Sequence, residues 1–261
     1  MFEAPKSDGT VGKALLVLGL VADFNRPVRF SEILTQSPFP KPTLYRFVQT
    51  LTNQGMLQFD VDRQTYTVGA RLLRLAHSAW QNSTLAPVAR TFLDDLAGQV
   101  NAAVHLAQMD NGHVLFVDKR TVTDQFETLA SAGRVAPGYC TGVGKAILAF
   151  SDTASLDQAM QQQTFVAKTA NTLTTEAALR DELEKIIENG VAFDREEHER
   201  GIISIAAPII TPRDKVIGAV SIASSTALHS LDDLNDFKPA LLQAVEQIGA
   251  EAEIWQVPSW T

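Results

Sequence analysis

Apolar and polar residues alternate with two different periods in the first part of this 261-residue chain. A helical spacing of apolar residues predicts three helices, over residues 11–24, 31–34 and 41–54. A strand-like alternation then predicts two short strands, over 57–61 and 66–68, with a polar turn between them. Three helices followed by a hairpin is the order of a winged helix-turn-helix domain.

A further helix, over 69–82, is expected to connect this domain to the rest of the chain. No stretch rich in Pro, Gly or Ser separates the two parts, so a helical connection is the simplest expectation. We also expect Thr10 and Ser31 to cap the first two helices, because a hydroxyl there can accept a bond from a free backbone N–H.

Helices and strands alternate from Thr84 onward. An antiparallel sheet flanked by helices is the simplest arrangement that buries all their apolar faces, so the predicted fold class is α+β. The expected strands are 102–108, 113–118, 191–193, 202–211 and 216–223. The expected helices are 85–99, 144–150, 155–162, 174–189 and 231–255.

The third predicted helix separates an apolar side from a side rich in hydrogen-bond donors. Phosphates are bound by Lys, Arg, Ser, Thr and Tyr, and base edges are read by Arg, Lys, Asn and Gln. The candidates for DNA contact on this helix are Lys41, Thr43, Tyr45, Arg46 and Gln49, with Ser31 and the hairpin's Arg63 as phosphate contacts. Spacing alone leaves a solvated helix face as the alternative. The order of elements and the local charge favour DNA.

Charge is distributed unevenly. The chain has a net charge of −8, which would disfavour nucleic acid if it were spread evenly. Residues 1–80 hold nine Lys/Arg and six Asp/Glu, a net +3, whereas the remainder holds 13 and 24, a net −11. A small basic segment on an acidic body is expected when one part meets phosphate, although the excess is modest.

The stretch GYCTGVGKAILAF, residues 138–150, places glycines before an apolar helix. It does not match the phosphate-loop motif. That motif has Gly where this chain has Tyr139, and Ser or Thr where this chain has Ala146. The N–H groups at the start of such a helix attract an anion such as a carboxylate. A tight structural turn remains the alternative.

The stretch GVAFDREEHERGIISIAAPI, residues 190–209, places Asp194 after an apolar strand. The glutamates that follow it are expected to form a solvated loop. Ser204 and Ser221 lie inside otherwise apolar strands, where a buried hydroxyl needs a partner. That partner is either the backbone or a ligand.

Enzyme chemistry finds little support in the residues. Cys140 could act as a nucleophile with a histidine base, or bind zinc with a histidine and Asp194, but no motif or ligand spacing supports either. We therefore expect no enzyme activity, cofactor or metal. The single cysteine, the absence of a long apolar run and the absence of a visible signal peptide predict a cytoplasmic protein without membrane contact.

With these residues in view, the chain resembles the IclR family of bacterial transcriptional regulators from about Val11 to Ala250. The resemblance depends on KPTLYRFVQTLTNQGML, CTGVGKAILA, and GVAFDREEHERGIISIAAPII followed by VIGAVSIASS, in that order. It implies a winged helix-turn-helix domain over 1–68, a linker helix over 69–83, and a GAF-like effector-binding domain over 84–261. It also implies homodimers or dimers of dimers.

The resemblance implies effector-binding residues where its motifs match. Gly142 and Val143 match a turn whose N–H groups hold a carboxylate or carbonyl, and Asp194 matches a pocket acid. Ser204 and Ser221 match polar strand positions, but the second serine of the family's pattern is Ala223 here, which predicts a different effector. Tyr139 and Cys140 flank the glycine turn and are expected to face the ligand. The segment 125–129 is expected to border the pocket.

These expectations predict a ligand-responsive regulator that binds double-stranded DNA at a near-palindromic operator. The expected role is a repressor of a catabolic operon, released by a small organic acid or aldehyde. The alternatives are an activator of the same family, a Cys140-dependent enzyme, and a binding module that uses its first helices for protein contact.

Overall fold

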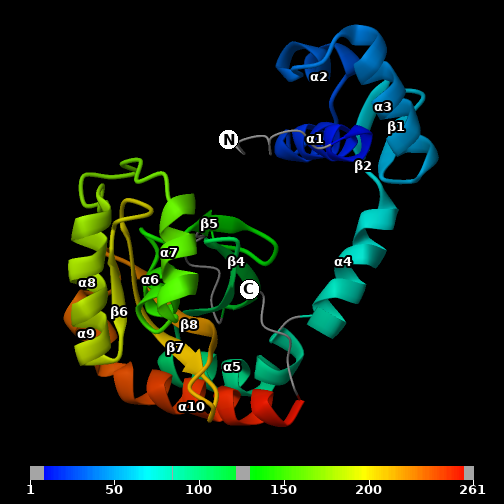
Figure 1. Cartoon of the computed structure of the whole chain (residues 1–261). Coiled ribbons are helices and arrows are strands. Elements are labelled where there is room, and N and C mark those ends of the chain that lie inside the picture. The colour runs from blue at the N-terminus through cyan, green and yellow to red at the C-terminus, as the bar shows by residue number, and fades with distance from the viewer. Residues whose placement is uncertain (1–8, 84, 122–129, 256–261) are drawn as a thin grey trace. The chain divides into compact units, whose positions relative to one another are not determined.

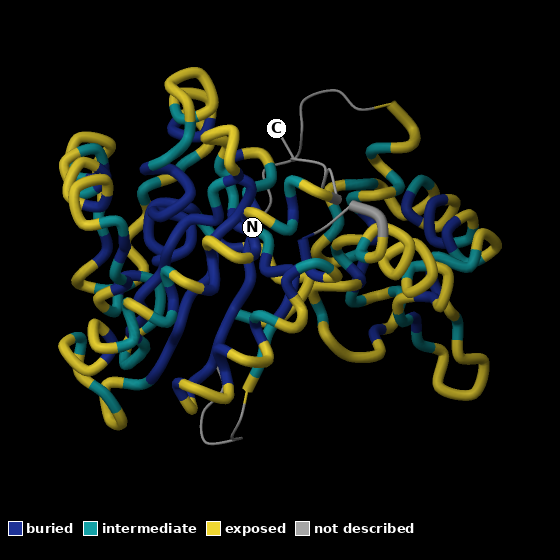
Figure 2. Tube along the Cα trace, turned by 90° about the horizontal axis from the view of Figure 1, so that it is seen from below, coloured by how far each residue is buried: buried dark blue, intermediate teal, exposed yellow. Residues whose placement is uncertain are grey.

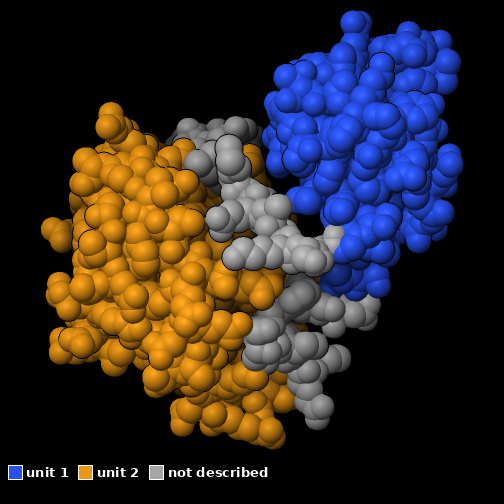
Figure 3. All heavy atoms as spheres, turned by 45° about the horizontal axis from the view of Figure 1, so that its top comes forward, with its two compact units in different colours: residues 1–79 blue, residues 80–261 orange. Residues whose placement is uncertain are grey.

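The computed structural model describes residues 9–83, 85–121 and 130–255, without the side chains of residues 82, 83 and 255. The chain divides into two compact units, and the division falls between Ala79 and Trp80 (Figures 1 and 3). This point lies inside helix α4, Ala70–Ser83, so a continuous helix joins the units, as the sequence indicates.

The first unit contains the three helices and the hairpin that the sequence predicts. Its elements are α1 Thr10–Asp23, α2 Phe30–Gln36, α3 Lys41–Asn53, β1 Leu57–Asp60 and β2 Thr65–Val68. The strands pair antiparallel. The apolar side of α3 is buried with residues from α1, α2 and the hairpin, which makes one small core. The core members that are fully or almost fully buried include Val17, Ile33, Leu44, Val48 and Leu57.

The predicted caps of the first two helices are wrong. Helix α2 begins one residue before Ser31, and Arg29 is its cap residue. The Glu32 carboxylate accepts a bond from the Arg29 backbone N–H at 2.9 Å and one from the Arg26 guanidinium at 2.7 Å. A glutamate reaching back in this way replaces a hydroxyl cap. Thr10 likewise lies inside α1, which follows Gly9.

The second unit is built on a six-stranded antiparallel sheet with the order β5-β4-β3-β8-β7-β6. The strands are β3 Ala103–Asp110, β4 His113–Arg120, β5 Val135–Pro137, β6 Ala192–Arg195, β7 Ile202–Ile210 and β8 Val216–Ser225. The short edge strand β5 has no counterpart among the strands that the sequence predicts. Figure 2 shows the long strands of this unit buried along most of their length.

Helices cover both faces of this sheet (Figure 1). They are α5 Ala86–Val100, α6 Gly142–Ala149, α7 Thr153–Gln162, α8 Glu176–Asn189, α9 Leu231–Asp236 and α10 Lys238–Trp255. Helices α5 and α10 lie on one face, and α6 lies on the other with α8 against it. The single closing helix predicted over 231–255 is two helices, because the first ends at its cap residue Phe237.

The two faces of the sheet differ in side-chain size. Under α5 and α10 the strands present large aliphatic residues such as Leu106, Ile205 and Ile222. Under α6 they present small ones such as Ala206 and Ala219. Small residues let a helix backbone approach the sheet closely. Within the described residues, no helix combines the length and apolar character that a membrane crossing requires.

Candidate DNA interface and effector cavity

Helix α3 presents the predicted DNA candidates on its outer side. Lys41, Tyr45 and Arg46 are exposed, and Thr43 and Gln49 are half-buried. The opposite side is buried through the apolar residues that the spacing predicts. The donors therefore point outward because the same spacing that builds the core excludes them from it.

The start of α2 lies beside this outer side. The ring of Tyr45 packs edge-to-face on Phe30, with ring centroids 6.0 Å apart. Ser31, the next residue, is exposed. Arg63 is exposed at the hairpin turn, where its guanidinium lies 3.9 Å from the Asp60 carboxylate. An exposed pair at that distance holds a side chain weakly, so Arg63 is available to other anions.

The second unit contains a cavity between the start of α6 and the small-residue face of the sheet. Its lining brings together five of the seven predicted effector residues. The lining residues are His105, Phe116, Ala130, Thr141, Gly142, Val143, Asp194, His198, Glu199, Ile202, Ser204, Ser221 and Ala223. The predicted segment 125–129 lies outside the described residues.

The start of α6 forms one wall of the cavity. Thr141 is the cap residue: its hydroxyl accepts a bond from Gly144 N–H at 3.2 Å and donates to the Pro137 carbonyl at 3.0 Å. A Cβ on Gly142 would lie 2.7 Å from the Ser204 hydroxyl oxygen, so any larger residue would fill the site. The first backbone N–H groups of a helix have no partner within it, which suits this wall to an anion or a carbonyl.

Asp194, on strand β6, lies beside this helix start: a Cβ on Gly142 would be 3.5 Å from the Asp194 backbone nitrogen. Its carboxylate accepts a bond from the Glu197 backbone N–H at 2.7 Å. Burial, with a smaller contribution from the Glu197 charge, raises the pKa of Asp194 to about 7. Near neutral pH this carboxyl can therefore carry a proton and donate a hydrogen bond to an anionic ligand.

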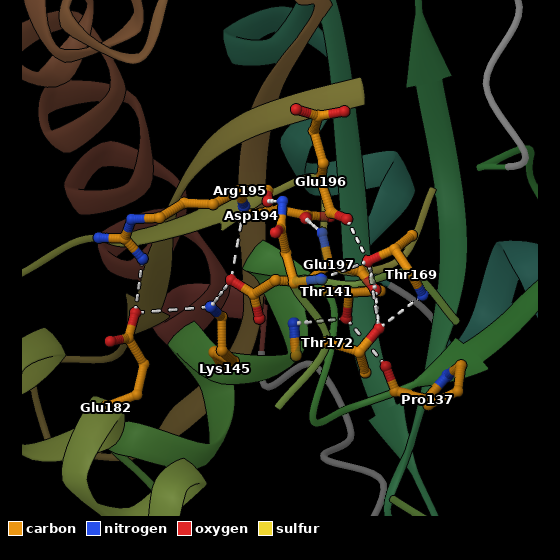
Figure 4. A network of polar contacts seen from close by, with 12 residues as sticks. Pro137, Thr141, Lys145, Thr169, Thr172, Glu182, Asp194, Arg195, Glu196 and Glu197 are labelled. Atoms are coloured by element: carbon orange, nitrogen blue, oxygen red, sulfur yellow. Dashed lines mark hydrogen bonds and ion pairs between the residues drawn. The ribbon is translucent and has the colours of Figure 1, made fainter. Parts of the chain in front are cut away.

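A buried ion-pair network beside the cavity links α6 to α8 and to the residues at the end of β6 (Figure 4). The Lys145 ammonium, on α6, lies 2.5 Å from the Glu197 carboxylate and 3.5 Å from that of Glu182. Glu182 also pairs with Arg195 at 2.8 Å. The lysine is fully buried and Glu197 nearly so. The expected solvated loop is thus wrong for Glu197, because its carboxylate is buried against a lysine distant in sequence. Glu199 is half-buried and lines the cavity.

His105 is a lining residue that the sequence did not single out for ligand contact. It lies on β3, directly opposite Ser221 in the register with β8. Burial, with a smaller effect of Lys119, lowers its pKa to about 3, so its imidazole is neutral. Its ring lies edge-to-face on Phe116, with centroids 5.8 Å apart. The alternation of 102–108 places it on one side of a strand, but only the strand pairing shows that this is the side of Ser221.

Tyr139 and Cys140 do not line the cavity, contrary to expectation. The Tyr139 hydroxyl donates to the Val166 carbonyl at 2.7 Å, and its ring lies beside Phe165. Cys140 is fully buried. Burial raises the pKa of its thiol to about 12, which keeps it protonated and a poor nucleophile. Among the described residues, no group of three or more His, Cys, Asp or Glu could hold a metal ion.

Two family models match the chain. The model of the bacterial transcriptional regulator IclR C-terminal domain matches residues 77–250, and that of the IclR helix-turn-helix domain matches residues 10–61. Together they cover both compact units.

Individual relatives agree with these matches. The chain is 27% identical to the HTH-type transcriptional regulator KdgR of Escherichia coli, over 94% of each protein. It is 24% identical to the transcriptional repressor IclR of the same organism, over 90% of this chain and 87% of the relative. The crystal structure of an IclR homolog from Microbacterium hydrocarbonoxydans, complexed with 4-hydroxybenzoate, shares the fold with a TM-score of 0.77 and 20% identity, covering 94% of this chain and 100% of that one.

Proposed function

The chain belongs to the IclR family of DNA-binding bacterial transcriptional regulators, and from this premise we propose that it represses a catabolic operon and leaves its operator when a small organic acid or aldehyde binds. The observation that carries the proposal is the buried polar cavity between the start of α6, Asp194 and the strand serines. A cavity lined by donors and by a carboxyl with a raised pKa suits a small polar ligand.

A ligand carboxylate or carbonyl fits the free N–H groups of Gly142 and Val143. Protonated Asp194 supplies a donor, and Ser204 and Ser221 supply hydroxyls for the rest of the ligand. The Microbacterium homolog was crystallised with 4-hydroxybenzoate, which has a carboxylate at one end and a hydroxyl at the other. This chemistry supports the class of ligand and leaves the individual compound to experiment.

DNA binding is assigned to the outer side of the first unit. Arg46, Tyr45 and Lys41 on α3 contact bases and phosphates, with help from Thr43 and Gln49. Ser31 on α2 and Arg63 on the hairpin contact phosphates. Most of these donors are exposed and α3 contains no Asp or Glu, which supports this role.

The exposed apolar residues of the first unit support a homodimer, or a dimer of dimers. Val11 on α1 is 75% exposed and Leu73 on α4 is 74% exposed, and Leu15 and Leu75 are also exposed. Apolar side chains of this size favour burial, and a second copy of the chain supplies it. Two copies would place two α3 helices about 34–36 Å apart, so the operator should be a near-palindrome.

Ligand and DNA are coupled by a shift between two forms of the protein. The ligand alters DNA affinity only through a difference in its own affinity for the DNA-competent form and the other form. Helix α4 joins the two units and is the element proposed to carry the change.

A gel-shift titration with DNA from upstream of the protein's own gene, in excess competitor DNA, tests the proposal. We expect specific binding that a small acid or aldehyde abolishes, and loss of that binding in Arg46→Ala. Lys13→Ala removes an equal charge from an exposed position on α1 and serves as the control. Unchanged operator affinity in Arg46→Ala would reject the DNA assignment, and a ligand that raises occupancy would identify an activator.

The remaining alternatives give different results. A Cys140-dependent enzyme requires turnover that Cys140→Ser abolishes, and the raised thiol pKa disfavours it. A protein-binding module lacks the salt dependence of DNA binding, in which each phosphate contact adds about 0.9 to the slope of log affinity against log salt.

A further inference from the structure

Strand β4 is irregular directly beside the cavity. Leu106 on β3 pairs with Asp118, whereas the next residue, Ala107, pairs with Phe116, so Val117 has no partner on β3. This is a β-bulge, in which one strand holds an extra residue whose backbone groups leave the regular ladder. Phe116, the residue before it, lines the cavity.

The carbonyl of this extra residue has a partner on helix α4. The indole N–H of Trp80 donates to the Val117 carbonyl at 3.1 Å. The Trp80 ring is partly buried against the apolar cluster of α5 and α10, and the Arg90 guanidinium lies 5.4 Å from its centroid. A directional bond and ring packing together fix Trp80 on β4 and α5.

Trp80 lies near the C-terminal end of α4, whose first residues belong to the DNA-binding unit. The bulge residue Val117 therefore follows a cavity residue, Phe116, in the chain, and its carbonyl accepts a hydrogen bond from α4. The other register shift of this sheet, at Ile209/Ile210 opposite β8, contains no residue that lines the cavity. The β4 bulge therefore adjoins both the cavity and α4, and the second irregularity does not adjoin the cavity.

We propose that Trp80 is a positioning residue that couples the effector cavity to helix α4 through the bulge at Val117. A ligand packed against Phe116 displaces the bulge, and the Val117 carbonyl carries that displacement to the indole N–H. The bond then favours a different setting of α4 and changes the population of the DNA-competent form. The inference rests on the proposed function, because it names the residue through which that cavity acts.

The test needs no known ligand, because Phe116→Leu alters the cavity wall directly. Operator affinity is measured for the full-length protein, Phe116→Leu, Trp80→Phe and the double variant, on DNA selected from a random pool. Trp80→Phe keeps an aromatic ring and removes the N–H donor. We expect Phe116→Leu to change operator affinity about fivefold or more in the presence of Trp80. In the Trp80→Phe protein the same change should have an effect of less than about twofold.

Equal effects of Phe116→Leu in both proteins would overturn the coupling role and leave the proposed function standing. An unsubstituted protein that selects no DNA would overturn the proposed function and this inference with it. Phe92→Leu is the control, since Phe92 is also partly buried against the apolar cluster of α5 and α10. Phe92→Leu and Phe116→Leu together should have additive effects on operator affinity. If this pair were as non-additive as the Trp80 pair, Trp80 would contribute no more than ordinary packing.

A spectroscopic readout separates positioning from stability. The chain has three tryptophans, so Trp255→Phe with Trp260→Phe leaves Trp80 as the one fluorophore of this type. Its emission maximum should shift when Phe116→Leu is added, because the bulge and the indole move together. An unchanged emission maximum in the folded variant would contradict the proposal.

Discussion

The two faces of the six-stranded sheet are made from the same strands and have different roles. Ile205 and Ser204 are neighbours on β7, yet the isoleucine packs under α5 and α10 and the serine lines the cavity beneath α6. The aliphatic face gains stability from buried area. The small-residue face leaves room for a helix start, two serines and a carboxyl. Residue size on alternating positions therefore separates stability from binding within one strand.

The separation is incomplete, because the binding face also contains the buried ion pair of Lys145 and Glu197. The Glu197 backbone N–H donates a hydrogen bond to the Asp194 carboxylate. The Glu197 carboxylate in turn accepts one from the Lys145 ammonium. Stability and site geometry are thus linked on this face through a buried ion pair, whereas the core of the other face is a large cluster of buried apolar residues. The predictions below test how far the two faces can be separated.

The largest expected effect is on the ion pair. Lys145→Met should destabilise the protein by about 3–5 kcal/mol, because it leaves the Glu197 charge buried without its nearest cation. Urea unfolding measures the loss. The double variant Lys145→Met with Glu197→Leu removes both charges and should recover most of the stability. A double variant as unstable as Lys145→Met would show that packing, and not charge, dominates at this position.

The next prediction compares Ile205 with Ser204, its neighbour on β7. Ile205→Ala should cost about 2–5 kcal/mol of unfolding free energy, because it leaves a cavity in a fully buried position. It should leave the ligand affinity of the folded protein unchanged. Ser204→Ala should cost about 1 kcal/mol or less and reduce ligand affinity. Calorimetry and urea unfolding on both variants check this, and equal losses of affinity would remove the distinction between the faces.

Gly142→Ala should lower ligand affinity by about tenfold or more while the fold is retained, since its Cβ would lie 2.7 Å from the Ser204 hydroxyl. Gly98→Ala on α5 is the matched control, because a Cβ there meets no atom within 4 Å. Calorimetry with the operator-releasing compound measures both variants. Ligand affinity retained in Gly142→Ala would place the ligand away from the α6 start.

The smallest effect concerns pH. Burial raises the pKa of Asp194 to about 7, from an ordinary value of 3.8, so folding favours the protonated form. Its contribution to stability is therefore full below the ordinary value and is lost as the pH rises through about 7. An anionic ligand also favours that form, so affinity should fall about tenfold between about pH 6 and pH 8.

The groups facing Asp194 are Glu197, Lys145, His198 and Glu199. Burial lowers the pKa of His198, so this histidine should not produce the same fall. Asp194→Asn should flatten the pH dependence, which calorimetry at several pH values would show. A fall that persists in Asp194→Asn would assign the titration to another group.

Local patterns along the chain determined most of the fold. The spacing of Leu44, Phe47, Val48 and Leu51 predicts α3 and its buried side, because helical period and burial follow from the same residues. Gly190 ends α8 in the left-handed conformation, and the sequence predicts that end. The break at Phe237 and the short strand β5 escaped prediction, since neither interrupts the apolar pattern.

The residues of the candidate site divide in the same way. Gly142, Val143, Asp194, Ser204 and Ser221 lie in stretches that resemble a known family, so they could be singled out by matching short motifs. That Asp194 and Gly142 lie beside each other in one cavity depends on α6 packing against β6. The start of α6 and the strand β6 are far apart in the chain, and no local pattern encodes their distance.

The sequence alone determined most of the helices and strands, which side of α3 is exposed, and which family the motifs resemble. The tertiary structure alone decided that Lys145 pairs with Glu197, that His105 lies opposite Ser221, and that Cys140 is fully buried without lining the cavity. It also decided that Trp80 bonds to the bulge at Val117. The physical reason is range: periodicity and capping involve residues a few positions apart, whereas burial, charge pairing and pKa depend on groups that only the folded chain brings together.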